Sequence, residues 1–338
     1  MTNLSLIGID LAKNVFQLCG ISSSGKLIEN KQLKRSALIT HVSKLKPTII
    51  AMEACYSSHY WAREFTKLGH QVKLLPAQHV KPFVIGNKSD RNDALAICEA
   101  AQRPNIKCVP IKTVEQQDIQ CLHRLRERHV AHRTGLINQA RGLLSEYGIV
   151  APLGLSAFMK MLREYTSPTN STLSSNLKKH LSSVADEFHW HTEQIEDIQQ
   201  DLQQYANLNP LCQYLLSIPG IGIINATSIY SAIGDGSQFN SAREFAVWLG
   251  LTPKQSGSGE KNFTGGISKR GNRYLRKQLV HGARSSVARS KTKKDPLSIW
   301  ANKLVERRGA PRAYVAMAAR MARIAWVLLQ KKENFKAV

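Results

Sequence analysis

Four acidic residues stand where their carboxylates could hold divalent metal ions together. Asp10 and Glu53 each end a short apolar run with the pattern of a buried strand. Asp90 and Asp93 begin a predicted helix, and residues three apart lie on one helix face. Mg²⁺ takes oxygen ligands, and two ions about 3.5–4 Å apart can activate an attacking oxygen and stabilise a leaving one. The four carboxylates are therefore the predicted metal ligands and catalytic acids of a site that acts on a nucleic-acid backbone.

Each of these acids also has a plain structural explanation. Aspartate is common at turns, so Asp10 could simply begin one. Asp90 and Asp93 could stabilise a helix N-terminus through the helix dipole, with Ser89 as the N-cap. Glu53 is harder to explain in this way because it directly follows four apolar residues. The metal interpretation depends on all four acids together and on the strands that precede two of them.

The charge of the chain favours a phosphate-bearing partner. The 338 residues carry a net charge of +23. From residue 254 to the end, 21 Lys and Arg stand against 4 Asp and Glu, which is about three quarters of the net charge in one quarter of the chain. A surface that only confers solubility usually mixes both signs. The predicted nucleic-acid contacts are Lys269, Arg270, Arg273, Arg276, Lys277 and Arg284, with solvated helix charges as the alternative.

A serine-rich segment precedes these basic residues. The run Ser256-Gly257-Ser258-Gly259 reads as a flexible loop and cannot be a helix interior. A serine in such a loop, backed by Arg and Lys, could attack a phosphodiester and form a phosphoserine link. A loop that only contacts DNA is the alternative. Further upstream, Pro219-Gly220-Ile221-Gly222 predicts either a phosphate contact at a helix start or a helix–helix turn with glycine caps.

The hydrophobic pattern predicts an α/β domain followed by helices. Strands are expected at 4–9, 15–21, 27–33, 48–54 and 71–75, and helices at 36–45, 59–68 and from Asp90 onward. This element order matches a ribonuclease H-like mixed sheet flanked by helices. Long polar helices are expected at 114–147 and 176–208, with a loop at 167–174 between them. Their sparse apolar seam predicts a coiled-coil or helical-hairpin insert, with the apolar positions Leu122, Leu125, Leu136, Leu143 and Leu144.

Other classes of protein fit less well. No apolar stretch approaches the roughly 20 residues that span a bilayer, and the N-terminus shows no signal-peptide pattern. The six cysteines lack the spacing of a zinc site or a disulfide framework. We expect a cytoplasmic protein that does not enter a membrane.

Motifs along nearly the whole chain resemble those of one transposase family. They are GIDLAK, MEAC, KSDRNDA, IPGIG, the GLTP…SGSGEK segment and GGISKRGNRYLR. Together they resemble the transposases of the insertion-sequence 110 family, and most closely its 1111 subgroup. Piv-type DNA invertases are relatives with a similar layout.

The resemblance implies a domain order, a mechanism and partners. It implies a RuvC-like catalytic domain at 1–112 whose DEDD acidic set is Asp10, Glu53, Asp90 and Asp93. A helical coiled-coil region at 113–209 and a C-terminal transposase domain at 210–338 would follow. The implied catalytic serine is Ser258, with Ser256 as the alternative because SGSGEK blurs the alignment.

Such proteins act as Mg²⁺-dependent recombinases guided by a structured noncoding RNA on donor and target DNA. Their active site is completed between the subunits of a dimer or tetramer. Two other activities stay open at this point, a Piv-like DNA invertase and a RuvC-like metal-dependent junction nuclease. A catalytically inert nucleic-acid-binding protein is a third possibility.

Overall fold

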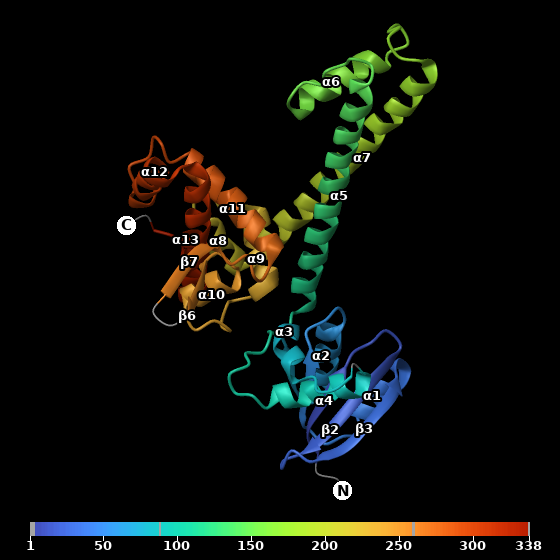
Figure 1. The fold of residues 1–338 in the computed structure, drawn as a ribbon, viewed down its shortest axis with the longest axis vertical. Helices are drawn as coiled ribbons and strands as arrows, with labels where there is room; N and C mark the ends of the chain where they lie inside the picture. Colours follow the sequence, from blue (N-terminus) through green and yellow to red (C-terminus); the bar gives the residue numbers. More distant parts are fainter. Residues whose placement is uncertain (1–3, 88, 259–260, 337–338) are drawn as a thin grey trace. The chain divides into compact units, whose positions relative to one another are not determined.

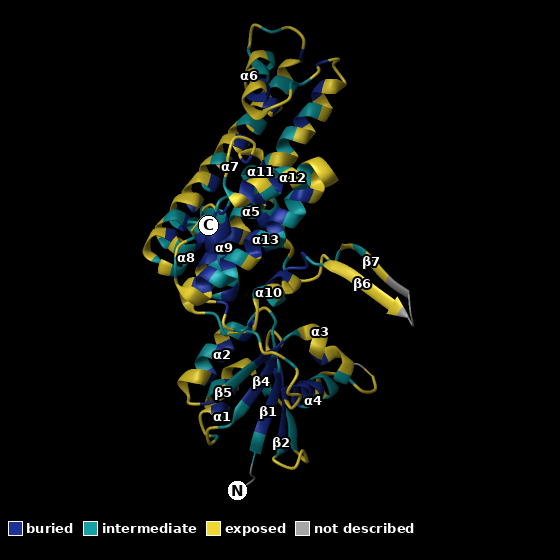
Figure 2. Cartoon of the chain, turned by 90° about the vertical axis from the view of Figure 1, so that its left-hand side faces the viewer, coloured by how far each residue is buried: buried dark blue, intermediate teal, exposed yellow. Residues whose placement is uncertain are grey.

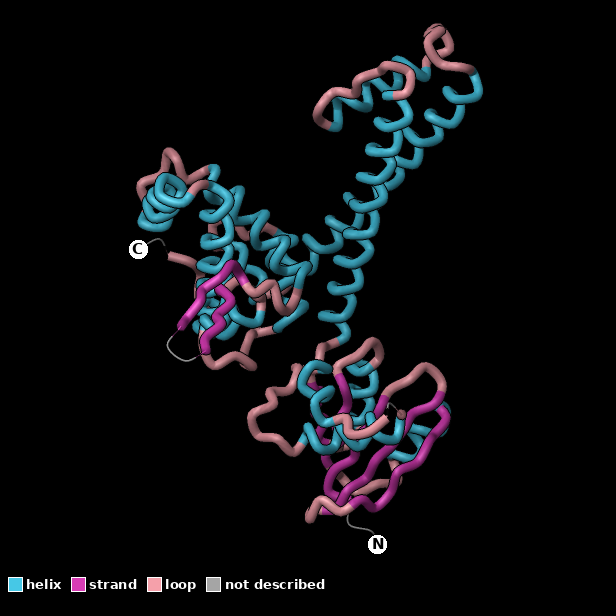
Figure 3. The backbone as a smooth tube through the Cα atoms, in the orientation of Figure 1, coloured by secondary structure: helices cyan, strands magenta, loops and turns pink. Residues whose placement is uncertain are grey.

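The computed structural model describes residues 4–87, 89–258 and 261–336. The chain forms two compact units, Met1–Val114 and Glu115–Val338. The first is a mixed α/β unit and the second is mainly helical with one strand hairpin (Figures 1 and 3). Apart from residues 113 and 114, the helical region predicted at 113–209 lies in the second unit, together with the C-terminal domain predicted at 210–338. No helix in the described ranges is both long and apolar enough to cross a membrane.

The first unit is built on a five-stranded mixed sheet. Its strands are β1 (Leu4–Asp10), β2 (Val15–Ser22), β3 (Leu27–Lys34), β4 (Ile49–Glu53) and β5 (Gln71–Leu75). They lie in the order β3-β2-β1-β4-β5. The pairs β1–β2 and β2–β3 are antiparallel, whereas β1–β4 and β4–β5 are parallel. The five predicted strands are confirmed, each within one residue at either end.

Helices cover both faces of this sheet. They are α1 (Arg35–Val42), α2 (Ser58–Lys67), α3 (Ala77–Val80), the 3₁₀ turn η1 (Lys81–Phe83) and α4 (Asp90–Ala101). Alternate residues of a strand point to opposite faces. Ile7 and Ile9 of β1 therefore join one buried cluster with α1 and α2, whereas Leu6 joins a second cluster with α4. Figure 2 shows the central strands β1 and β4 largely buried between these layers.

Gly8 lets helix α4 approach the sheet closely. A Cβ atom at position 8 would lie 2.6 Å from the Ala94 carbonyl oxygen and 2.7 Å from the Cys98 Sγ. Cys98 in turn donates a hydrogen bond to the carbonyl oxygen of Cys19 on β2 (3.2 Å). The glycine of the GIDLAK motif therefore sets the distance between β1, which ends in Asp10, and the helix that begins with Asp90.

The second unit contains the remaining helices and a hairpin. Its elements are α5 (Val114–Ser145), α6 (Leu155–Thr166), α7 (Ser175–Leu208), α8 (Pro210–Leu216), α9 (Ile223–Ile233), α10 (Ala242–Trp248), β6 (Pro253–Ser258), β7 (Lys261–Ile267), α11 (Arg273–Ala288), α12 (Pro296–Arg308) and α13 (Ala310–Lys331). The two long helices and the loop between α6 and α7 agree with prediction. The strands β6 and β7 were not expected, because Ser-Gly repeats have low strand propensity and the pairing partner follows the turn.

The seam between α5 and α7 differs from the predicted leucine seam. Leu125 and Leu143 are exposed at 41% and 44%, and of the five predicted leucines only Leu144 is buried. Two histidines occupy seam positions instead, and His129 and His191 hydrogen-bond through their Nδ1 atoms at 2.9 Å. A search for periodic apolar residues does not find a helix–helix seam in which buried polar side chains hydrogen-bond to each other.

The glycines of the IPGIG motif serve close backbone packing. Gly220 has a φ of 92°, which favours glycine, and a Cβ there would lie 2.7 Å from the carbonyl oxygen of Gly282 on α11. A Cβ on Gly282 would lie only 2.2 Å from the Gly220 carbonyl oxygen. Of the two interpretations of this motif, the helix–helix turn with glycines thus has a direct structural reason.

We expect Gly282→Ala to destabilise the second unit by about 1–3 kcal/mol, because the new methyl group overpacks a backbone contact. Gly135 on α5 is the matched control, since it is also helical and a Cβ there meets nothing within 4 Å. Helix propensity alone would make either Gly→Ala change stabilising by about 1 kcal/mol. Chemical denaturation measures both variants. A gain in stability for Gly282→Ala equal to that for Gly135→Ala would show that the contact is unimportant.

His123 is a buried histidine that joins three helices of this unit. It is 3% exposed. The Thr227 hydroxyl donates to the carbonyl oxygen of Ile223 (2.7 Å) and therefore accepts from the His123 Nε2–H (3.0 Å), while the Tyr274 hydroxyl donates to Nδ1 (2.9 Å). Burial, followed by the charge of Arg126, lowers the pKa of His123 to about 4. The neutral ring is thus built into the fold.

This histidine should make the second unit acid-sensitive. Because its folded pKa lies below the unfolded value near 6.5, the unfolded state binds the proton first and stability falls as pH drops from 6.5 toward 4. The loss expected between pH 7 and pH 5 is about 2 kcal/mol. Denaturation at both pH values should show a weaker pH dependence for His123→Gln. The exposed His281 on α11 provides the control substitution, and an unchanged pH dependence in His123→Gln would contradict the assignment.

Candidate catalytic site and nucleic-acid interface

The ends of two parallel strands place Asp10 and Glu53 side by side. In the register of β1 and β4, Ile9 is paired with Met52, and the next residue on each strand is the acid. Strand alternation puts both acids on the sheet face that also carries Gly8 and Ala51, and this face packs against α4. The structure therefore brings the two acids, which the sequence predicts at the ends of separate strands, to one edge and one face of the sheet.

Helix α4, which packs on this face of the sheet, contributes the other two acids. Asp90 and Asp93 lie in its first turn, where Asp90 is exposed and Asp93 is partly buried. Ser89 is the N-cap, and its Oγ accepts a hydrogen bond from the amide of Asn92 (3.3 Å). The position of Asp90 and Asp93 in the first helical turn therefore agrees both with stabilisation of the helix N-terminus and with a place near the other two acids.

The four carboxylates act on one another electrostatically. The pKa of Asp10 is raised to about 6, first by burial and then by the charges of Asp93, Asp90 and Glu53. The pKa of Glu53 is also raised, by burial and then by Asp93. Like charges held together disfavour their ionised forms. A cation placed among these side chains would relieve that repulsion.

The donor set suits a hard divalent cation, although the side chains do not form a closed coordination shell. Carboxylate oxygens are the ligands that Mg²⁺ prefers, and it usually keeps several of its waters. Over the ranges that the structure describes, no three His, Cys, Asp or Glu side chains gather closely enough to hold a metal ion. The four acids are thus electrostatic neighbours on one surface whose chemistry fits a metal.

The candidate serines lie in the second unit, on the hairpin. Ser256 is paired with Phe263 and Ser258 with Lys261, at the end of β6. Ser256 is exposed. The side chain of Ser258 lies outside the described part of the structure. The choice between the two serines therefore stays a prediction from sequence.

The predicted basic contacts divide into two groups by their partners. Lys269, Arg270, Arg273 and Arg284 are exposed. The Arg276 guanidinium instead donates from Nη1 to the carbonyl oxygens of Leu249 (2.8 Å) and Arg270 (3.0 Å), and Lys277 forms an ion pair with Glu127. Arg276 holds the loop before α11 in place, a role that residue type alone did not indicate.

Two glycines of the GLTP and KRGN motifs fix the same loop. Gly250 and Gly271 have φ values of 70° and 77°. A Cβ on Gly250 would lie 2.1 Å from the Arg270 carbonyl oxygen, and one on Gly271 would lie 1.8 Å from the Trp248 carbonyl oxygen. These positioning glycines were not singled out from the sequence. Each lies within a motif that the sequence analysis named, so the motifs themselves were the available signal.

Comparison with known proteins assigns the family. Residues 7–149 match the DEDD-type transposase family of IS110, and residues 212–297 match the family described as transposase IS116/IS110/IS902. The transposase for insertion sequence element IS1111A of Coxiella burnetii is 43% identical over 336 residues, covering 99% of this chain and 92% of that protein. The chain belongs to the IS110/IS116/IS902 family of transposases.

Two further relatives agree with this assignment. A probable family 20 transposase of Pseudomonas aeruginosa is 42% identical over 335 residues, with 99% of each chain covered. A pilin gene-inverting protein of Moraxella lacunata is 26% identical over 269 residues, which cover 75% of this chain and 73% of that protein. The protein is therefore a DNA transposase or recombinase, and the predicted likeness to the insertion-sequence 110 family and its invertase relatives is confirmed.

Proposed function

We propose that this transposase breaks and rejoins DNA strands through a serine–phosphate link, at a site whose metal is held by Asp10, Glu53, Asp90 and Asp93. The observation that carries the proposal is the position of Asp10 and Glu53 at the ends of neighbouring strands, on the sheet face that packs against the helix that begins with Asp90 and Asp93. Burial first, and then the charges of the other three acids, raise the pKa of Asp10 to about 6. The strand order β3-β2-β1-β4-β5 supports a RuvC-like reading of residues 1–112. The match to a DEDD transposase family over this region supports the same roles.

The chemistry uses the serine as the nucleophile. Its Oγ attacks the phosphorus of the DNA backbone, a serine–phosphate bond forms, and the bond from phosphorus to a deoxyribose oxygen breaks. The released hydroxyl gains a proton, and the serine loses one. A bound divalent cation, Mg²⁺ in our proposal, would stabilise charge on the phosphate oxygens as a Lewis acid. Because the phosphodiester is exchanged and not hydrolysed, the strand can be rejoined.

The assignment of Ser258 as the nucleophile, with Ser256 as the alternative, places the serine and the acids in different compact units. As the resemblance to this family implies, we propose an oligomer, a dimer or tetramer, in which the site is completed between subunits. The helical region 113–209 would serve this assembly, and 210–338 would act as the C-terminal transposase domain. A structured guide RNA would choose the donor and target DNA by base pairing, which leaves the protein to grip backbones through Lys and Arg.

A junction nuclease is the second candidate, because the same four acids could act with water and would not need a serine. It is distinguished by the product of the reaction. Purified protein with its co-purifying RNA should convert DNA that carries the element ends into rejoined strands in the presence of Mg²⁺. Chelation of the metal should abolish the reaction, and removal of the RNA should abolish the choice of target. Cleaved strands without rejoined product would favour the nuclease.

A further inference from the structure

A basic cleft lies beside the serine hairpin in the second unit. Its volume is about 870 Å³. One wall is the stem of the hairpin, including Lys254 and Ser256, and another is helix α10 with Arg243. Helix α13 contributes Arg323, and the loop before α11 contributes Arg270. Four cations from four segments of the chain thus converge on one hollow that also contains a candidate serine.

The charges of this cleft are available to a ligand. Arg243, Lys254, Arg270 and Arg323 are all exposed, and none of them forms an ion pair with another described residue. The Arg323 Nε donates to the Ala319 carbonyl oxygen of its own helix (3.3 Å), which fixes the base of that side chain. Among the described residues that line the cleft, none is an aspartate or glutamate. Uncompensated guanidinium groups around one hollow are suited to phosphate oxygens.

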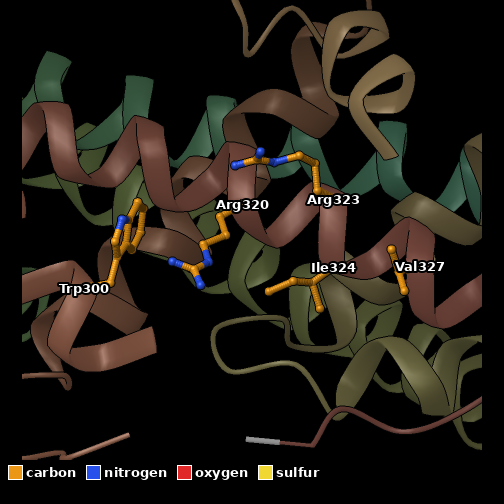
Figure 4. A pocket seen from close by; sticks show the side chains of 5 residues that line it. All are labelled: Trp300, Arg320, Arg323, Ile324 and Val327. Atoms are coloured by element: carbon orange, nitrogen blue, oxygen red, sulfur yellow. The ribbon is translucent and has the colours of Figure 1, made fainter. Parts of the chain in front are cut away.

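A second hollow adjoins the cleft along α13. Its volume is about 460 Å³, and it is lined by Trp300, Arg320, Arg323, Ile324 and Val327 (Figure 4). The Arg320 guanidinium lies over the Trp300 ring, 4.6 Å from the ring centroid. Because Arg323 lines both hollows, the basic track continues past the cleft along this helix.

We propose that this cleft holds the backbone of the DNA strand that is presented to the serine, with Arg243 and Arg323 as phosphate-binding residues. The occupant is inferred as DNA because Ser256 lines the cleft and Ser258 ends the same strand, so this part of the proposal rests on the proposed function. Neither arginine is among the six nucleic-acid contacts predicted from the sequence, and Arg243 also lies outside the basic segment 254–338. They lie 80 positions apart and meet only because α10 packs against α13.

The test measures binding of a fluorescein-labelled single-stranded DNA oligonucleotide to the full-length protein. Fluorescence anisotropy in EDTA gives the binding constant at several salt concentrations. Arg243→Ala and Arg323→Ala should each weaken binding about tenfold, to a similar extent for two unrelated sequences, because phosphate contacts carry no sequence information. Each change should also reduce the salt dependence of log K by about 0.7, the value for one phosphate of a single strand. Arg243→Lys and Arg323→Lys keep the charge and should restore the salt dependence.

Arg312→Ala is the matched control, since Arg312 is exposed on the same helix α13 and lines neither hollow. It should bind like the unaltered protein. Binding and salt dependence of the double variant Arg243→Ala/Arg323→Ala that equal those of Arg312→Ala would overturn the proposal. The proposal would also be overturned if the arginine variants lost affinity only for an RNA oligonucleotide of the same sequence and bound the DNA normally.

Chemistry is separated from binding by a variant with both Ser256 and Ser258 changed to alanine. It should bind the oligonucleotide normally in EDTA. If the serine mechanism is wrong, this variant still exchanges strands, while the binding losses of the arginine variants persist. If the cleft is wrong, those binding losses are absent whatever the serines do.

Discussion

Asp10→Asn should abolish strand cleavage while leaving the first unit folded and slightly more stable. A metal ion contributes several kcal/mol to the stabilisation of a phosphoryl transition state, and each 1.4 kcal/mol is a factor of ten in rate. Loss of one ligand oxygen charge should therefore slow cleavage by about 10³-fold or more. The same change removes a partly buried carboxylate that is repelled by three others.

The stability change has the opposite sign to that expected for a structural acid. A carboxylate whose folded pKa is about 6, above its usual value of 3.8, costs stability when it is ionised at neutral pH. After allowance for solvent screening, Asn should raise the free energy of unfolding by about 1 kcal/mol at pH 7.5 without metal.

Glu99→Gln is the matched control for this experiment. Glu99 lies on the same helix α4 and pairs with Arg103 at the surface. It should leave cleavage unchanged. Activity of Asp10→Asn close to that of Glu99→Gln would remove Asp10 from the catalytic set, and a large loss of stability would make it a structural residue.

Ser258→Ala should abolish both the covalent protein–DNA link and strand joining, by about 10³-fold or more, because no other oxygen takes over the attack. DNA binding should be preserved, since a hydroxyl contributes little to backbone grip beside the neighbouring cations. Ser256→Ala is the matched control, two residues away on the same strand β6. It should retain joining within a few-fold of the unaltered protein. Joining that survives in Ser258→Ala and disappears in Ser256→Ala would reverse the assignment.

The sequence predicted the sheet and the long helices well, because their patterns are strongly periodic. The strand predicted at 71–75 has those bounds in the structure, and Asp10 and Glu53 each end a strand as expected. Strand ends are set by local sequence, and parallel pairing then brings them together. The positions of those two acids at the strand ends therefore follow from the sequence alone.

Other features depend on contacts between residues that are distant in the sequence, and they could not be predicted from the sequence. Arg243 and Arg323 share a cleft only after α10 and α13 pack. Arg276 has the residue type and spacing of a DNA contact, yet its guanidinium donates to two carbonyl oxygens of the chain. The hairpin of β6 and β7 owes its strands to cross-strand pairing, where the Ser-Gly pattern had suggested a flexible loop.

The most direct test of the mechanism is to trap the covalent protein–DNA adduct and identify the linked residue by mass spectrometry. Trypsin should release residues 255–261 as one peptide, which contains both candidate serines. The account predicts that a nucleotide remnant is attached to this peptide through the Ser258 oxygen, only when metal is present and Asp10 is intact. Cleavage that incorporates oxygen from water and leaves no nucleotide on this peptide would contradict it.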